Sequence, residues 1–154
     1  MKKIILMLML FAPLSLFAQK FGHINSQTVI ESLPEYVKAR AEVEGQAKAF
    51  DNDLQAMQKE IQTKAEAYDK SASTMNDTKR KETEAELQGL YQKFQQAQQD
   101  NSQALQKLQQ EKMQPIISKL QNAIKNVGKA GGYVYIMDVS SGIPYISETL
   151  SKDV

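Results

Sequence analysis

Residues 43–61, with the sequence VEGQAKAFDNDLQAMQKEI, decide the fold of this chain. Their apolar or small residues recur at alternating steps of four and three, which is the two-position stripe of a coiled coil. The stripe consists of Val43, Ala47, Phe50, Leu54, Met57 and Ile61. After an irregular step to Ala65, it resumes at Tyr68 and Ala72. No proline interrupts residues 35–71, so the pattern predicts one long helix.

A second stripe follows a polar break at residues 71–78, where Ser, Thr, Asn and Asp gather. Such residues interrupt and cap helices. The second stripe comprises Leu87, Leu90, Phe94, Ala97 and Asn101, restarts one residue late at Leu105 and Leu108, and continues through Met113, Ile116 or Ile117, Leu120, Ile124 and Val127. We expect Pro115 to bend this helix, because proline lacks the backbone donor. The two stripes predict an antiparallel helical hairpin over residues 35–127, with its tip near 71–78.

The two ends of the mature chain carry β signals. Residues 20–25 have the alternation of a strand, and Ser26 is placed to cap a short helical turn. Gly128, Gly131 and Gly132 should end the long helix, and residues 133–138 are rich in β-branched and aromatic residues. We expect a turn at 140–142 and an antiparallel return over 143–147, at a sheet edge because Pro144 cannot donate. Residues 19–34 and 128–154 are thus predicted to form a small β-containing base, in a fold that is mainly α.

The first residues are typical of an export signal. Lys2 and Lys3 precede an apolar run from Ile4 to Phe17, and Ala18 offers a small residue for cleavage. We therefore predict a signal peptide over residues 1–18, with an uncleaved anchor as the alternative. The absence of cysteine excludes a lipidated cysteine and any disulfide.

Charge and composition exclude several functional classes. Removing the signal takes away two lysines and no acids, so the formal charge of +1 becomes −1. A near-neutral chain argues against nucleic acid as the main partner. Tryptophan is absent, and the centre is crowded with Gln, Lys, Glu and Ala, which form helices but do not fill a thick core. Stability should come from helix pairing and from a partner chain.

Candidate chemistry is sparse, and we predict that the protein is not an enzyme. His23 is the sole histidine and has no acidic or thiol companion nearby in sequence, which favours a structural role over catalysis or metal binding. Residues 128–132, GKAGG, resemble a phosphate loop, but they close a helix and precede a strand, which is the wrong order. We therefore expect no catalytic residue, no metal and no cofactor.

Adaptable side chains lie along the predicted hairpin. The glutamine-rich stretch 88–114 favours either a solvated helix face or a lining that touches an unfolded chain through many weak contacts. Methionine and aromatic residues suit surfaces that bind varied partners, although residues on a stripe usually pack against the other helix. The candidate contacts for an unfolded chain are Met57, Tyr68, Met75, Tyr91 and Phe94.

The chain resembles the Skp (OmpH-like) family of periplasmic chaperones. The resemblance rests on segments that occur in a fixed order after an export signal, with the helical hairpin between them. The segments are FGHINSQTVI (21–30), LPEYVKA (33–39), QPII (114–117), AIKNV (123–127) and GGYVYIMD (131–138), together with the glutamine-rich return helix.

The resemblance implies a periplasmic homotrimer in which β elements of three chains form a body and three helical arms enclose a cavity. It also implies ATP-independent holding of unfolded outer-membrane β-barrel proteins, with no catalytic residues to carry over. The apolar β residues expected in the body are Phe21, Ile24, Val134, Ile136 and Ile143. Better-known members are strongly basic, so the near-neutral charge here argues against membrane or lipopolysaccharide contact. The alternative function is a structural or adaptor coiled coil of the cell envelope.

Overall fold

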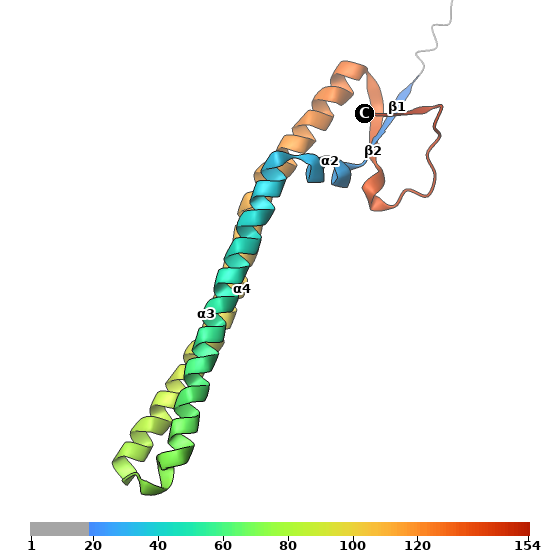
Figure 1. Ribbon diagram of the computed structural model, residues 1–154. Helices are drawn as coiled ribbons and strands as arrows, with labels where there is room; N and C mark the ends of the chain where they lie inside the picture. Colours follow the sequence, from blue (N-terminus) through green and yellow to red (C-terminus); the bar gives the residue numbers. More distant parts are fainter. Residues whose placement is uncertain (1–18) are drawn as a thin grey trace, which may run out of the picture. The chain divides into compact units, whose positions relative to one another are not determined.

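The computed structural model describes residues 19–154 (Figure 1), so the predicted signal peptide lies outside the described residues. The elements are β1 (Lys20–Ile24), α2 (Ser26–Ser32), α3 (Pro34–Ser71), the 3₁₀ turn η2 (Ala72–Thr74), α4 (Asp77–Gly131), β2 (Tyr133–Asp138), the 3₁₀ turn η3 (Val139–Ser141) and β3 (Ser151–Asp153). The described residues form two compact units, one from residues 19–26 together with Asn122–Val154, the other from Gln27–Gln121. The predicted class, mainly α with a small β part, is confirmed.

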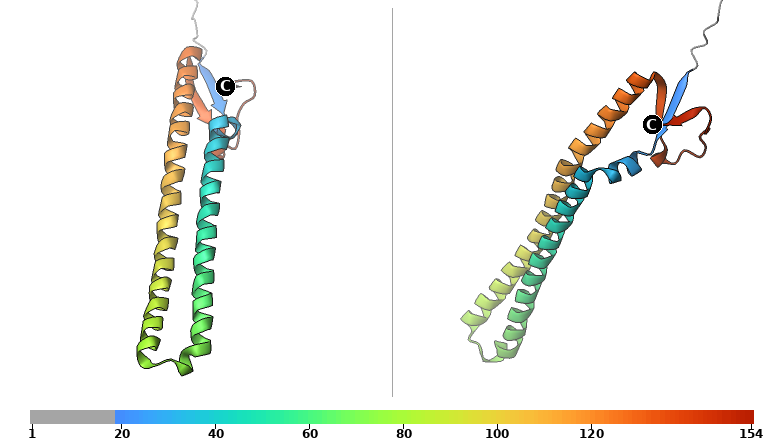
Figure 2. Two further views of the ribbon diagram at one scale, coloured as in Figure 1. Left: turned by 60° about the vertical axis from the view of Figure 1, so that its left-hand side comes forward. Right: turned by 45° about the horizontal axis from the view of Figure 1, so that its top comes forward.

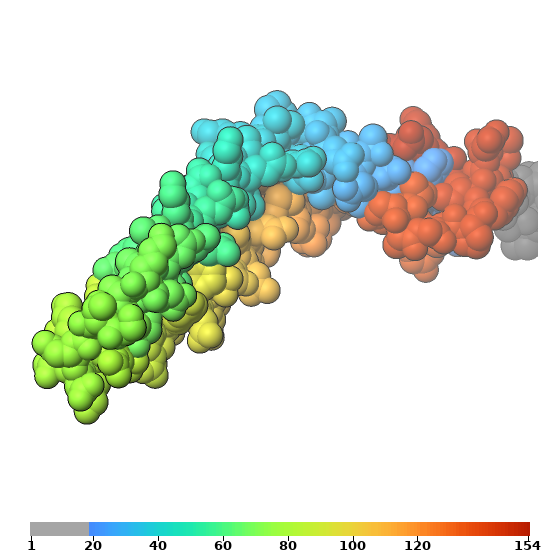
Figure 3. All heavy atoms as spheres, turned by 60° about the horizontal axis from the view of Figure 1, so that its bottom comes forward, coloured from blue at the N-terminus to red at the C-terminus, as the bar shows by residue number. Residues whose placement is uncertain are grey.

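The second unit is an antiparallel hairpin, which we call the arm. Helices α3 and α4 run side by side in every ribbon view (Figures 1 and 2). In the space-filling view their side chains touch along the arm, α3 in cyan and green and α4 in yellow and orange (Figure 3). Within residues 19–154, neither long helix contains an apolar stretch that could cross a membrane.

The α3 stripe predicted over residues 43–61 is confirmed. Every residue of the stripe is at least partly buried, and every residue between stripe positions is exposed. Ile61 is the most enclosed of them, at 6% exposure. The α4 stripe is at least partly buried from Leu87 to Ile124, including the late restart at Leu105, whereas its last predicted member, Val127, is 44% exposed. Because burial alternates with the coiled-coil steps, the arm is stabilised by a narrow apolar seam.

Polar contacts between the helices set the register of the arm. Lys119 pairs with Glu35 across 84 residues of chain, Lys64 with Glu86 across 22, and Tyr68 donates to Glu84 across 16. These separations shrink toward the tip, as an antiparallel pair requires. The side chains of the two ion pairs are 36% to 66% exposed, so these pairs specify alignment more than they add stability.

The tip confirms the predicted polar break. Asn76 caps the start of α4, since its Oδ1 accepts from the backbone N–H of Lys79 at 2.8 Å and its carbonyl accepts from that of Arg80 at 3.0 Å. Thr74 Oγ1 donates to the Ser71 carbonyl at 2.9 Å. Short polar side chains here satisfy backbone groups that helix ends leave without partners.

The first unit contains a three-stranded sheet in the order β2-β1-β3, and both pairings are parallel. The predicted strands near 20–25 and 133–138 are confirmed as β1 and β2. The long helix extends four residues beyond Val127, to Gly131, and Gly132 then takes the left-handed conformation (φ +66°). Gly131 leaves room for the ring of Tyr133, since a Cβ there would lie 2.3 Å from Tyr133 Cε2.

The antiparallel return predicted over residues 143–147 is wrong. The third strand is β3, which pairs with β1 and not with β2. After β2, η3 and Gly142 (φ +84°) turn the chain out of the sheet, and Pro144 has no N–H for a ladder. A parallel partner needs a crossover, and residues 142–150 supply it. Ile143 is partly buried but belongs to no strand.

Asp138 joins the end of β2 to the start of α2. Its carboxylate accepts from the backbone N–H groups of Ser26 (3.2 Å) and Ser140 (3.0 Å), and from the hydroxyl of Ser26. Ser26, which was predicted to cap the turn, is instead the first residue of α2, and its N–H and hydroxyl both donate to the Asp138 carboxylate. The Ser26 hydroxyl, followed by the Ser140 contacts, lowers the pKa of Asp138 from 3.8 to about 2.

Ile61→Ala should destabilise the arm because it removes the most enclosed side chain of the α3 stripe. We expect a loss of about 2–4 kcal/mol in unfolding free energy. The measurement is urea unfolding followed by circular dichroism, at equal protein concentration because assembly affects apparent stability. Lys59→Ala, an exposed α3 substitution, is the control and should unfold as wild type. Equal urea midpoints for the two variants would contradict the conclusion that the apolar seam stabilises the arm.

Asp138→Asn should weaken the protein by less than about 1 kcal/mol, the usual value of a helix cap lost to alanine, because the amide keeps one acceptor oxygen but not the charge. Because folding lowers the pKa of Asp138, its ionised form stabilises the protein, and the contribution is lost as pH falls from 3.8 to about 2. The midpoint difference between wild type and variant should therefore be full at neutral pH and shrink across this window. Thermal unfolding over a pH series tests this, with Asp153→Asn as the exposed control. A pH-independent difference would disprove the assignment.

Candidate binding surfaces

The arm carries a shallow groove of about 570 Å³, which we call the arm groove. Its lining residues come from one face of each helix. They are Gln58, Ile61, Gln62, Ala65, Glu66 and Asp69 of α3, and Tyr91, Phe94, Gln95 and Gln98 of α4. Positions three and four apart share a face of a helix, which is why this set gathers.

The groove has an apolar floor and an accessible aromatic rim. Ile61 is nearly fully buried, and Phe94 is partly buried in the α4 stripe. Tyr91 stands one turn from Phe94 and is 49% exposed. A large exposed ring beside a buried apolar floor provides contact area for a partner side chain.

Of the predicted contacts for an unfolded chain, the structure brings Tyr91 and Phe94 together in the arm groove. Met57 is partly buried in the α3 stripe and lies outside the groove lining. The hydroxyl of Tyr68 donates to Glu84, which raises the pKa of that tyrosine. Met75 is partly buried at the tip, where its carbonyl accepts from Arg80 Nη2 at 3.4 Å.

Several groove residues were not among the predicted contacts. Gln58 and Gln62 precede the glutamine-rich stretch, and Ala65 was treated only as an irregular step of the stripe. Their spacing places them on one face of α3, which was a usable signal. What the sequence did not give is the register that sets this face beside Tyr91.

A second surface lies on one face of the sheet, and we call it the sheet face. Phe21 pairs with Tyr135 and His23 with Met137 in the β1–β2 register, and paired residues of neighbouring strands point to the same side. The rings of Phe21 and Tyr135 stack, with centroids 6.3 Å apart and planes 8° apart. Tyr135 is 61% exposed and Met137 is 52% exposed.

Loop residues enlarge the apolar area around the sheet face. Tyr145 and Leu150, both strongly exposed, line a cavity of about 220 Å³ together with Phe21, Tyr135 and Met137. Exposed apolar residues gathered in this way are typical of protein-interaction sites.

The five residues predicted for the trimer body fall into different environments. Phe21 belongs to the sheet face, whereas Ile24 is buried and Ile136 is partly buried. Gly22 pairs with Ile136, so these two positions face the side opposite Phe21. Val134 is 47% exposed, and Ile143 is partly buried outside the strands. Tyr135, Met137, Tyr145 and Leu150 also surround the sheet face but were not among the predicted residues, because the sequence alone does not show the β1–β2 register or the crossover.

His23 lies within the sheet and joins two strands. Its Nδ1 is 2.9 Å from Ser151 Oγ, which links β1 to β3. Within residues 19–154, His, Cys, Asp and Glu side chains form no group of three that could hold a metal ion.

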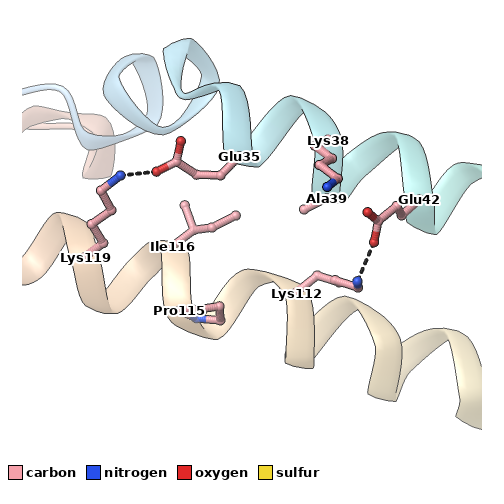
Figure 4. Close-up of a pocket in the computed structure, with 8 residues that line it drawn as sticks. All are labelled: Glu35, Lys38, Ala39, Glu42, Lys112, Pro115, Ile116 and Lys119. Carbon is pink, nitrogen blue, oxygen red and sulfur yellow. Dashed lines mark hydrogen bonds and ion pairs between the residues drawn. The ribbon is translucent and has the colours of Figure 1, made fainter.

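A third hollow, near Pro115, is a structural contact of the arm (Figure 4). Lys119 pairs with Glu35 and Lys112 with Glu42, one pair on each side of the buried Ile116. These pairings lower the pKa of both glutamates. The helix runs through Pro115 without interruption. Because Lys119, Glu35, Lys112 and Glu42 already pair with one another, this hollow is a poor candidate for a ligand site.

Comparison with known families gives a match over residues 20–154, which is the whole of the described chain except Gln19. The matching family is "Outer membrane protein (OmpH-like)". The chain belongs to the OmpH-like family. The match includes both surfaces, so the arm groove and the sheet face lie within the family's region.

Curated relatives are named "Chaperone protein Skp". The protein of Yersinia enterocolitica is 29% identical over 147 residues, covering 96% of this chain and 88% of its own length. The protein of Pectobacterium atrosepticum is 26% identical, covering 89% and 81%. The crystal structure of an OmpH-like protein from Caulobacter crescentus aligns with a TM-score of 0.75 at 14% identity, covering 86% and 78%. That similarity confirms the fold.

Phe94→Ala and Tyr91→Ala should show which of the two rings packs in the seam and which is available at the surface of the arm groove. Phe94 is partly buried, so its truncation should cost about 2 kcal/mol, less than for a fully enclosed phenylalanine. Tyr91 is half exposed, and its truncation should leave the thermal midpoint close to wild type. Circular dichroism melts measure both. A large loss of stability in Tyr91→Ala would show that its ring is part of the seam and unavailable to a partner.

Proposed function

We propose that the mature protein is a periplasmic holding chaperone, which binds unfolded outer-membrane β-barrel proteins and prevents their aggregation without ATP. The observation that carries the proposal is a slender arm with an apolar groove and a glutamine-rich helix, in a family whose curated relatives are named as chaperones. The predicted export signal over residues 1–18 supports the periplasmic location.

The working form is proposed to be a homotrimer. An arm that is two helices thick cannot surround an unfolded chain, so several arms must cooperate. The sheet face supports assembly because a monomer in water would leave Phe21, Tyr135 and Met137 exposed. In this proposal residues 19–34 and 128–154 form the trimer body, and the hairpin 35–127 is the arm that borders a shared cavity.

Holding by the arms requires many weak contacts. An unfolded barrel protein exposes apolar side chains and unpaired backbone groups, which aggregate when left in water. Met57, Tyr68, Met75, Tyr91 and Phe94 stay our candidates for contact, and Tyr91 has the strongest support because its ring is accessible. Contacts from three arms act at high effective concentration, so weak individual contacts retain a client without fixing its fold. Release then needs only a more stable folded state in the membrane.

The mature protein should suppress the aggregation of an unfolded outer-membrane barrel protein diluted from urea. Light scattering with and without an equimolar amount of trimer measures this, in buffer without nucleotide. The competing function, a structural coiled coil of the envelope, predicts unchanged turbidity. Unchanged turbidity would therefore refute the chaperone proposal.

Tyr135→Glu should break the trimer, because it places a charge on the apolar sheet face. Analytical ultracentrifugation should show a trimer for the wild type and a monomer for the variant, with helical content retained. Val37→Glu is the matched control, since Val37 has a similar exposure of 59% but lies on the arm. A trimer in both variants would rule out the sheet face as the assembly surface.

A further inference from the structure

We propose that the arm groove selects client segments in which aromatic or apolar side chains stand next to lysine or arginine, and that Glu66 and Asp69 determine this specificity. The inference rests on the proposed holding function, because it names the kind of segment that the arms prefer.

The charged side chains that line the arm groove are all acidic. Glu66 and Asp69 lie three residues apart on α3 and line the part of the groove nearer the tip. None of the described residues that line the groove is lysine or arginine. Lys64, which precedes Ala65, is paired with Glu86. A basic side chain in the groove therefore meets two carboxylates and no lining cation.

The apolar part of the groove suits a neighbouring aromatic or aliphatic side chain. Ile61 and Ala65 form an apolar strip along α3, and Phe94 and Tyr91 face it from α4. The exposed ring of Tyr91 can stack on an aromatic side chain or lie against the cation of an arginine. The groove thus offers adjacent places for an apolar group and for a positive charge.

The amides along both edges favour an extended polypeptide as the occupant. Gln58 and Gln62 flank the strip on α3, and Gln95 and Gln98 flank it on α4. Each amide carries a donor and an acceptor, so it can pair with the backbone N–H and C=O groups that an unfolded chain leaves unsatisfied. Gln62 Nε2 also donates to Glu66 Oε1 at 2.9 Å, which holds that carboxylate beside the groove.

The expected selectivity is modest, as a chaperone that must release its clients requires. Exposed ion pairs are weak individually, and two of them give a preference of about three- to tenfold. Salt should reduce the preference, because both carboxylates are accessible to ions.

Two short peptides of equal length test the inference on the full mature trimer. Both alternate phenylalanine with polar residues, and the polar positions carry lysine in one peptide and glutamate in the other. Fluorescence anisotropy of labelled peptides at low salt should give about three- to tenfold tighter binding of the lysine peptide. Equal affinities, or tighter binding of the glutamate peptide, would overturn the inference.

Variants locate the preference. Glu66→Gln combined with Asp69→Asn should bring the two peptides to similar affinity, whereas Tyr91→Ala should weaken both. The matched control is Asp53→Asn combined with Glu60→Gln, an exposed acidic pair on α3 outside the groove lining, and it should keep the preference. A photoreactive residue at Gln95 should cross-link the lysine peptide more strongly than one at Lys93, which is exposed outside the lining. A preference that is lost in the control pair or kept in the groove pair would contradict the assignment.

The same proteins separate this inference from the proposed function. If the wild type suppresses the aggregation of the barrel protein but binds both peptides equally, the chaperone function is supported and the groove specificity is refuted. A lysine-peptide preference in a wild type that fails to suppress aggregation removes the holding function and leaves a peptide-binding groove.

Discussion

The structure depends on how narrow the apolar stripe of each long helix is. A stripe with steps of three and four can be covered by one other helix and leaves nothing for a third layer. The result is a two-helix arm whose flanks remain exposed to solvent. Its seam runs from Val43 to Ile61 on α3 and from Leu87 to Leu108 on α4. Groups on those flanks are available for partners because the fold does not need them.

Periodicity made the arm predictable from the sequence. The stripes, the tip near residues 71–78 and the strands β1 and β2 all follow from local pattern. The third strand does not, because Ser151–Asp153 has no strand signal of its own and pairs with β1 across more than a hundred residues of chain. Pro144 correctly indicated a limit on pairing, but the sequence could not show that the chain crosses over instead of turning back.

The binding surfaces show the same division. Tyr91 and Phe94 were found as candidates from residue type alone, whereas their partners Ile61 and Ala65 depend on the register of the hairpin. That register is set by contacts such as Lys64 with Glu86, which no local pattern specifies. Likewise, Asp138 was predicted only as the end of a strand, yet its carboxylate caps α2 from far along the chain. Long-range polar contacts are the part of this fold that single-sequence reasoning misses.

The irregular step from Ile61 to Ala65 has a mechanical consequence. Two successive steps of four residues, Met57 to Ile61 and Ile61 to Ala65, amount to a stutter, which locally unwinds a left-handed supercoil. Both residues of the second step line the arm groove. Where the supercoil unwinds, the stripe of α3 turns slightly away from its partner helix, and the arm groove lies at that point of α3. Moving this extra four-residue step to another heptad would therefore move the arm groove along the arm.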